Sequence, residues 1–273
     1  MNARSFAKVV LGDTVVGAWI GRAPFLERAY KHWAMSRRDS SGLYYGVYNT
    51  YEEAFADLPS WRAAGWDNDG AAAMWVDNIS PIRAGTYPVF FWLSQLLHEG
   101  SIVIDYGGSI GLTYYGFRRY AHQPADLRWI VVEVPRIAEQ GRCVAKREAA
   151  ASIEFETALE AVPDGDVLLA LGSLQYMKQS VPGLLELRAT NPPHVILNKV
   201  PLTQGNSYWT LQNFGPSICP YRVYNEADFI GYFEQAGYRL KDRWGVYELD
   251  CYVPFHPHEF LPFLTGLYFK KPA

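Results

Sequence analysis

The stretch SIVIDYGGSIGLTYY at residues 101–115 decides how this chain is interpreted. An apolar run closes on Asp105, a cluster of glycines follows, and an aromatic segment with helix-like spacing begins. That order predicts a strand, a sharp turn and then a helix, with the turn at the carboxyl end of the strand. Two different kinds of site are built on such turns, and residues 107–111 cannot readily serve both.

The first interpretation of the turn is a nucleophile elbow. Residues 107–111 fit the pattern G-x-S-x-G, which presents a serine nucleophile in α/β-hydrolases. That elbow follows a central strand of a sheet, whereas roughly 100 residues with few strand-like runs precede Ser109. No upstream H-G-G loop is present to supply an oxyanion hole. Because His194, His256 and His258 lie downstream, a serine hydrolase that uses Ser109 stays open as an alternative.

The second interpretation is a loop that binds a cofactor, on the first strand of a doubly wound sheet. Asp105 then precedes the glycines, and Glu133 ends the next strand-like run. A carboxylate at that place matches the two hydroxyl groups of a ribose. An acid two residues before the first glycine fits S-adenosylmethionine, whose amino acid end a carboxylate and loop amides can hold. NAD and NADP stay open, although the Y-x-x-x-K pair of short-chain dehydrogenases and a P-loop are both missing. The loop residues predicted to contact the cofactor are Gly107, Gly108, Ser109 and Gly111.

From residue 101 onward, apolar runs alternate with helix-like segments. Near-continuous apolar strands separated by helices are typical of a parallel sheet that is buried on both faces. The sequence therefore predicts an α/β protein with a Rossmann-like, doubly wound, mostly parallel sheet over residues 99–273. Residues 1–98 carry aromatic clusters and predict a mainly helical N-terminal region that could act as a lid. The four runs are SIVID (101–105), LRWIVVEV (127–134), DVLLAL (166–171) and HVILNKV (194–200).

The remainder of the C-terminal half predicts one further helix and two strands. The segment NEADFIGYFEQAG at 225–237 is amphipathic, with Asn225 as its N-cap and Gly237 as its stop. The strand-like runs YRLKDRW (238–244) and LTGLYFKK (264–271) follow it.

Composition narrows the class of partner. The net charge is −3, the pI is about 6.1 and no basic block occurs, which argues against a nucleic-acid partner. The three cysteines form no C-x-x-C pair, so a reducing, cytoplasmic setting is expected. The apolar stretch VVLGDTVVGAWI at 9–20 is shorter than the roughly 20 residues of a membrane span and has no signal-peptide cleavage site, so neither is predicted.

Four segments, in this order, resemble a known family: IVIDYGGSIG, WIVVEVPRIAEQGR, DVLLALGSLQYM and PYRVYNEADFIGYFEQAGYRL. They look like S-adenosylmethionine-dependent methyltransferases associated with bacterial surface-polysaccharide and O-antigen gene sets, over roughly residues 45–273. The resemblance implies the class I methyltransferase fold, S-adenosylmethionine as cofactor, and a small-molecule acceptor such as a sugar or sugar nucleotide. It also implies that Phe155 and Glu156 lie near the adenine. Ser109 departs from the general methyltransferase loop, in which the middle residue is usually a glycine.

Other candidate residues follow from the rule that ligands bind beyond the carboxyl ends of the strands. Methyl transfer needs alignment of the acceptor with the methyl group, and a base if the acceptor is a hydroxyl. The loop at 251–260 holds Cys251 and two histidines but lacks a full ligand set, so no metal site is predicted. A non-catalytic module with this fold remains a second alternative. Cofactor contacts are predicted at Gly172 and Ser173, acceptor contacts at Gln175, Tyr176, Tyr221 and Arg222, and catalytic candidates at Tyr176, Asn198 and His256, with Lys199 beside Asn198.

Overall fold

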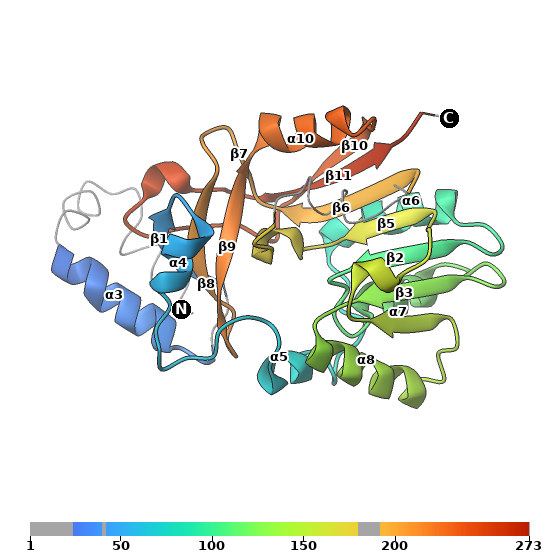
Figure 1. Ribbon diagram of the computed structural model, residues 1–273, viewed down its shortest axis with the longest axis horizontal. Helices are drawn as coiled ribbons and strands as arrows, with labels where there is room; N and C mark the ends of the chain where they lie inside the picture. The colour runs from blue at the N-terminus through green and yellow to red at the C-terminus, as the bar shows by residue number, and fades with distance from the viewer. Residues whose placement is uncertain (1–23, 40–41, 180–191, 273) are drawn as a thin grey trace.

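The computed structural model describes residues 24–39, 42–179 and 192–272, and these residues form two β-sheets (Figure 1). The larger sheet has seven strands in the order β10-β11-β6-β5-β2-β3-β4. All are parallel except β11, which runs antiparallel to both of its neighbours. The strands are β2 (Ile102–Tyr106), β3 (Arg128–Val132), β4 (Ile153–Glu156), β5 (Val167–Ala170), β6 (His194–Val200), β10 (Arg239–Val246) and β11 (Leu264–Lys270).

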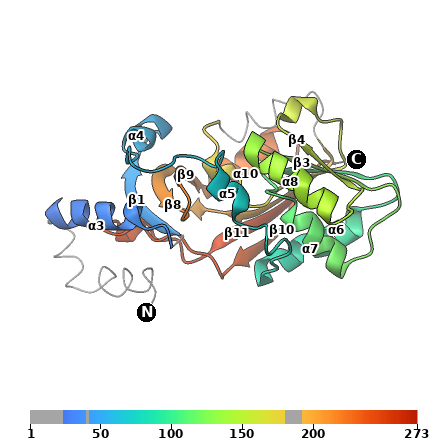
Figure 2. The same ribbon diagram turned by 90° about the horizontal axis from the view of Figure 1, so that it is seen from below.

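Helices cover both faces of this sheet (Figures 1 and 2). Successive residues of a strand point to opposite faces, so a strand buried on both sides must be apolar throughout. In β3, Trp129 and Val131 enter one core while Ile130 and Val132 enter the other. The α/β, doubly wound, mostly parallel sheet predicted from the sequence is confirmed. One face packs against α6 (Tyr87–Leu96), α7 (Leu112–Tyr120) and α8 (Pro135–Arg147), and the other against α10 (Glu226–Gln235).

Helix α10 begins and ends where the sequence predicts. The side chain of Asn225 accepts a hydrogen bond from the backbone N–H of Asp228 at 2.9 Å, which satisfies a donor that the first helical turn leaves free. Gly237 has a φ of +84°, and its N–H donates to the carbonyl of Glu234. That left-handed position is the usual glycine signal for the end of a helix.

The smaller sheet has four strands in the order β1-β8-β9-β7. Strand β1 comes from the N-terminal region, and it pairs with β8 so that Leu43 lies opposite Asn213. Residues 24–98 therefore contribute a strand as well as helices, and sheet pairing crosses the boundary predicted near residue 99. The division into 1–98 and 99–273 stays a prediction. The strands are β1 (Leu43–Tyr48), β7 (Leu202–Thr203), β8 (Tyr208–Asn213) and β9 (Ile218–Asn225).

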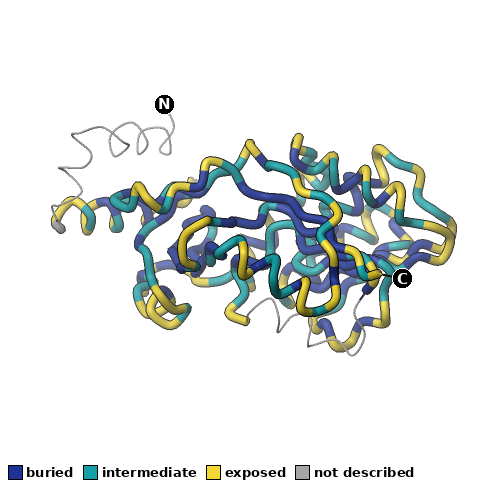
Figure 3. Tube along the Cα trace, turned by 90° about the horizontal axis from the view of Figure 1, so that it is seen from above, coloured by how far each residue is buried: buried dark blue, intermediate teal, exposed yellow. Residues whose placement is uncertain are grey.

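The remaining elements are short, apart from one helix of the N-terminal region. Figure 3 shows that the most deeply buried parts of the chain run through the middle of the molecule, while the connecting loops are exposed. Within the described ranges, no helix is both long and apolar enough to cross a membrane. These elements are α3 (Pro24–Ser36), α4 (Tyr51–Ala56), α5 (Asp69–Ala73), η1 (Ala84–Thr86), η2 (Leu159–Ala161), η3 (Leu174–Tyr176) and η4 (Pro257–Glu259).

Candidate functional site

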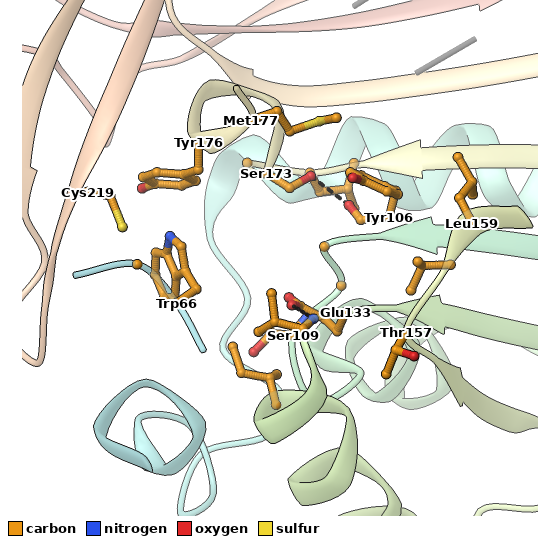
Figure 4. Close-up of a pocket in the computed structure, with 18 of the residues that line it drawn as sticks. Trp66, Tyr106, Ser109, Glu133, Thr157, Leu159, Ser173, Tyr176, Met177 and Cys219 are labelled. Carbon is orange, nitrogen blue, oxygen red and sulfur yellow. Dashed lines mark hydrogen bonds between the residues drawn. The ribbon is translucent and has the colours of Figure 1, made fainter. Parts of the chain in front are cut away.

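A cavity of about 830 Å³ lies at the carboxyl edge of the large sheet, where the strands point toward the smaller sheet (Figures 1 and 4). The sheet side of the cavity is formed by the residues that follow β2, β3, β4 and β5. The opposite side comes from residues 51–66 and from Cys219 and Pro220 of β9. Open α/β sheets bind their ligands at this edge, so the cavity is the candidate site.

The glycine-rich loop after β2 brings backbone, rather than side chains, to the cavity. Gly107 has a φ of +70°, and a Cβ atom added to it would lie 2.2 Å from the Cβ of Ser173. A Cβ on Gly108 would lie 2.5 Å from the carboxyl carbon of Asp105. Both residues and Ser109 line the cavity. Glycine is required here because nothing larger fits between the loop and its neighbours.

Gly111 does not line the cavity, contrary to the prediction. It has a φ of +92° and is the N-cap of α7, and an added Cβ would lie 2.4 Å from Cδ1 of Ile153. Its role is therefore to let α7 begin close to the sheet. The spacing of glycines alone cannot separate a glycine that contacts a ligand from one that permits close packing.

Asp105 is also placed differently from the prediction. Its side chain is fully buried beneath the loop and does not line the cavity. One carboxyl oxygen accepts a hydrogen bond from the indole N–H of Trp129 at 3.1 Å. Burial raises the pKa of Asp105 to about 7, and the nearby charge of Glu133 adds to that effect. Asp105 lies inside β2 rather than after it, which explains its burial.

Glu133 lies at the cavity surface, directly after β3 (Figure 4). Its two carboxyl oxygens accept hydrogen bonds from the backbone N–H groups of Ser109 at 3.0 Å and Val134 at 2.9 Å. Burial raises its pKa to about 6, so the group is mostly ionised at neutral pH. Each carboxylate oxygen keeps a free lone pair. Glu133 can therefore fix the loop and still accept hydrogen bonds from a diol.

The wall beyond β4 begins one residue later than the resemblance implied. Phe155 is buried in the core under Gly141 of α8, where a Cβ would lie 2.2 Å from its ring. Glu156 does not line the cavity, and its backbone carbonyl accepts a hydrogen bond from the N–H of Glu133. The lining residues are instead Thr157, Ala158, Leu159 and Glu160. They directly follow the end of β4 at Glu156.

The segment after β5 lines the centre of the cavity. Gly172 and Ser173 reach its surface, and the hydroxyl of Ser173 donates to the carbonyl of Tyr106 at 2.6 Å. Gln175 is buried behind this segment and does not line the cavity, because its amide donates to the carbonyl of Gly172 at 3.0 Å. The candidate acceptor contact at Gln175 is therefore not placed at the surface.

Tyr176 lines the cavity, but its hydroxyl is already engaged. It donates a hydrogen bond to Oε1 of Gln212 at 2.6 Å. The ring lies edge-on to Trp66 and to Tyr221, with centroid distances of 5.2 and 5.5 Å. Burial raises the pKa of Tyr176 well above its usual value. A phenol in this state is a poor proton acceptor, so Tyr176 is better suited to shaping the site than to acting as a base.

Two catalytic candidates lie outside the cavity lining. The amide of Asn198 donates to the carbonyl of Gly85 at 2.9 Å and accepts from the indole N–H of Trp244 at 3.1 Å, so both of its polar groups are used in the core. His256 precedes η4 in a loop near the smaller sheet. Neither residue lines the cavity, contrary to the prediction.

We expect the change Asn198→Ala to lower stability without changing the site. Gly85 would lose its donor and Trp244 its acceptor in a buried place, which should cost about 1–3 kcal/mol. Urea unfolding should show this loss, while calorimetry on the folded variant should give an unchanged dissociation constant for any ligand of the cavity. His256→Ala is the matched control and should change neither quantity.

The predicted acceptor contacts on β9 also lie outside the lining. Tyr221 is buried against the rings of Tyr44 and Tyr176. The guanidinium of Arg222 lies over the rings of Trp209 and Tyr224, at 5.5 and 4.9 Å from their centroids. Residues 218–225 form a strand, so these side chains alternate across the small sheet instead of facing a loop site.

Aromatic side chains of the N-terminal region form a wall that was not assigned from the sequence. Trp66 lines the cavity opposite the sheet, with Tyr51 and Phe55 beside it. Its ring stacks on Phe214 with centroids 3.9 Å apart, and its buried indole N–H has no hydrogen-bond partner. The dense aromatic clusters before residue 98 were the available signal, but their spacing does not say which rings face a ligand.

Lys199 follows Asn198 and does line the cavity. It has a φ of +57°, a left-handed conformation that is uncommon for a residue other than glycine. Burial lowers its pKa. Its ammonium group makes no hydrogen bond or ion pair with any of the residues described. Strained backbone conformations of this kind cluster at binding and active sites.

The described residues that line the cavity do not include a histidine base for serine hydrolysis. Ser109 has a φ of +56° and lines the cavity, but none of the described residues that line it is a histidine. Within the described parts of the chain, no group of three or more histidine, cysteine, aspartate or glutamate side chains is placed to hold a metal ion.

Comparison with known proteins gives matches of structure but not of sequence. No protein-family model matches the chain, and no curated protein sequence matches it either. One similar structure is a chain of a complex between the Trm112 methyltransferase activator of Haloferax volcanii and a protein assigned as a methyltransferase. It has a TM-score of 0.50 and 14% identity, over 76% of this chain and 96% of that one.

Two further structures are similar at a lower level. The 1,6-didemethyltoxoflavin-N1-methyltransferase of Burkholderia thailandensis, with S-adenosylhomocysteine bound, has a TM-score of 0.47 and 18% identity, over 70% of this chain and 79% of that one. An S-adenosylmethionine-dependent methyltransferase of Mesorhizobium loti has a TM-score of 0.47 and 11% identity, over 72% and 100%. At these identities the likeness concerns the fold alone, and the predicted class I methyltransferase fold is confirmed.

Proposed function

We propose that the chain is an S-adenosylmethionine-dependent methyltransferase that acts on a small molecule. The observation that carries this proposal is Glu133, a partly buried carboxylate that directly follows β3 and holds the glycine-rich loop at the cavity surface. A carboxylate in this position suits the ribose of a nucleoside cofactor. Thr157–Glu160 would then border the adenine, and Gly107 and Gly172 would border the amino acid end.

The acceptor would occupy the aromatic side of the cavity. Figure 4 shows Trp66, Tyr176 and Cys219 on the side away from Thr157 and Leu159. Aromatic side chains bind flat apolar surfaces, and Trp66 and Tyr176 both line this side of the cavity. A sugar or sugar nucleotide of surface-glycan biosynthesis is the acceptor that the sequence resemblance implies, and its apolar ring face would fit this wall.

Transfer of a methyl group from a sulfonium is an in-line displacement. The acceptor atom forms a bond to the methyl carbon while the bond from that carbon to sulfur breaks, and the acceptor releases a proton. When bound, the cofactor supplies the activated methyl group. The contribution of the protein is alignment of the two reactants and exclusion of water, which the walls of the cavity would provide.

The test is a thermal-shift and calorimetry screen of S-adenosylmethionine, S-adenosylhomocysteine, NAD and NADP. We expect the two adenosyl sulfur compounds to bind and to raise the melting temperature, since a ligand at 100 times its dissociation constant stabilises by about 2.7 kcal/mol. A shift with NAD or NADP alone would contradict the proposal. Absence of any shift would favour a non-catalytic module, and labelling of Ser109 by a fluorophosphonate would favour the hydrolase.

A further inference from the structure

The charged residues at the cavity surface are distributed unevenly. Among the described residues that line it, three are charged: Glu133, Glu160 and Lys199. The two carboxylates follow β3 and β4, and the lysine lies at the end of β6. Along the sheet edge the strands run in the order β4, β3, β2, β5, β6. The cavity therefore has acidic groups at one end of this row and a single cation at the other.

The position of Lys199 is set by its backbone and by Gly172. In a regular strand, successive side chains point to alternate faces of the sheet. The left-handed conformation of Lys199 breaks this alternation in β6. A Cβ atom added to Gly172 would lie 3.2 Å from Cδ and 3.6 Å from Cβ of Lys199, so the stem of the lysine passes directly over the residue that follows β5 and Leu171. The missing side chain at Gly172 is what leaves room for Lys199 at the cavity.

The ammonium group of Lys199 has no direct ion-pair partner among the described residues. Burial lowers the pKa of its ammonium group and the charge of Arg83 lowers it further, while Glu248 and Asp105 act in the opposite direction. Neither carboxylate forms an ion pair with it within the described parts of the chain. Lys199 is partly buried, and a partly buried cation without an ion-pair partner is costly, so an anion brought by a ligand lowers that cost.

The order in which the parts of the proposed cofactor lie along the cavity identifies the anion that would pair with Lys199. With the adenine bordered by Thr157–Glu160 and the ribose held by Glu133, the third part of the cofactor must continue past Gly107 toward Gly172. That part is an amino acid, which carries a carboxylate. We propose that the ammonium group of Lys199 binds the carboxylate at the amino acid end of the cofactor, an inference that rests on the proposed function.

The test compares S-adenosylmethionine with decarboxylated S-adenosylmethionine, which lacks only the carboxylate. Calorimetry on the wild-type protein should show that the intact compound binds about 10- to 100-fold more tightly, since hydrogen bonds between charged groups are worth about 1.5–3 kcal/mol and 1.4 kcal/mol is tenfold. In Lys199→Met this preference should fall to less than about threefold. Lys199→Arg should retain most of it.

The matched control is Lys178→Met. Lys178 is exposed, pairs with Glu52 at 2.9 Å and does not line the cavity, so the same change of charge and shape should leave the preference intact. A wild-type protein that binds both compounds equally would overturn the inference while leaving the proposed function standing. So would a Lys199→Met variant that loses turnover but keeps the full preference, because that result indicates a base. Failure of the wild type to bind either compound would instead remove the proposed function.

Discussion

Replacement of Glu133 by alanine is expected to weaken the binding of S-adenosylhomocysteine by about 10- to 100-fold. The carboxylate is held in place by the backbone N–H groups of Ser109 and Val134, so it needs no reorganisation before it accepts the ribose hydroxyls. Two charge-assisted hydrogen bonds would be lost, and competition from water at the edge of the cavity reduces the free energy that this loss costs. Titration calorimetry gives the dissociation constant, and circular dichroism confirms that the variant is folded.

Two other changes separate this role from a general effect on the loop. Glu156→Ala removes a carboxylate one strand away that does not line the cavity, and it should leave binding unchanged. Ser109→Ala should also leave binding intact, because Ser109 contacts Glu133 through its backbone. A folded Glu133→Ala variant with the wild-type dissociation constant would remove the ribose assignment. Loss of activity in Ser109→Ala alone would reverse the ranking and favour the hydrolase.

The large sheet was predictable because its signal is local. Each buried parallel strand must be apolar on both faces, and four such runs are visible directly in the sequence. Helix α10 was predictable for the same reason, since Asn225 and Gly237 act within one turn of its ends. Gly107, Gly108 and Glu133 follow from these elements, because a residue just past a strand end lies at the edge of the sheet.

Predicted site residues that lie outside the cavity lining are found where a shift of one residue in the strand end decides whether a side chain is buried or reaches the cavity. Asp105 and Glu133 both close apolar runs, but β2 continues to Tyr106 while β3 stops at Val132. The first acid is therefore buried and the second reaches the cavity. Strand ends cannot be placed to one residue from a single sequence. Phe155 and Glu156 do lie at the end of β4, and the cavity lining begins at the next residue, Thr157.

The aromatic wall could not be predicted because it depends on contacts between distant parts of the chain. Trp66 faces the cavity only because Phe214 lies behind it, on a segment that the smaller sheet brings close. Strand β1 joins that sheet by pairing with β8, more than 150 residues away. Tyr221 and Arg222 lie within β9, whose pairing with β8 is equally invisible in the local sequence.

Asp105→Asn is expected to remove a strong dependence of stability on pH. In the folded protein burial raises the pKa of this carboxyl to about 7, against a usual value of 3.8. The native state therefore binds a proton that the unfolded chain has already released, and stability falls as the pH rises from about 4 to about 7. Each tenfold change in proton affinity is worth about 1.4 kcal/mol, so this one group accounts for a loss on the order of 4 kcal/mol.

Asparagine tests this account because it is close in shape to the protonated acid and cannot ionise. It can still accept the hydrogen bond from Trp129, so the fold should be retained. Urea unfolding without ligand gives the free energy of unfolding of both proteins at each pH. Relative to the wild type, the free energy of unfolding of Asp105→Asn should increase steadily between pH 4 and pH 7, and this gain should persist at pH 8. Glu154→Gln is the control. The carboxylate of Glu154 is paired with Arg128 at the surface and has a lowered pKa. The difference in free energy of unfolding between this variant and the wild type should therefore not change with pH above about pH 5. If the difference in free energy of unfolding between Asp105→Asn and the wild type also does not change with pH, the carboxyl of Asp105 is ionised in the folded protein without loss of stability. Water would then have to reach it beneath Gly108, and the loop would be more open at that point than the close approach of Gly108 to Asp105 allows.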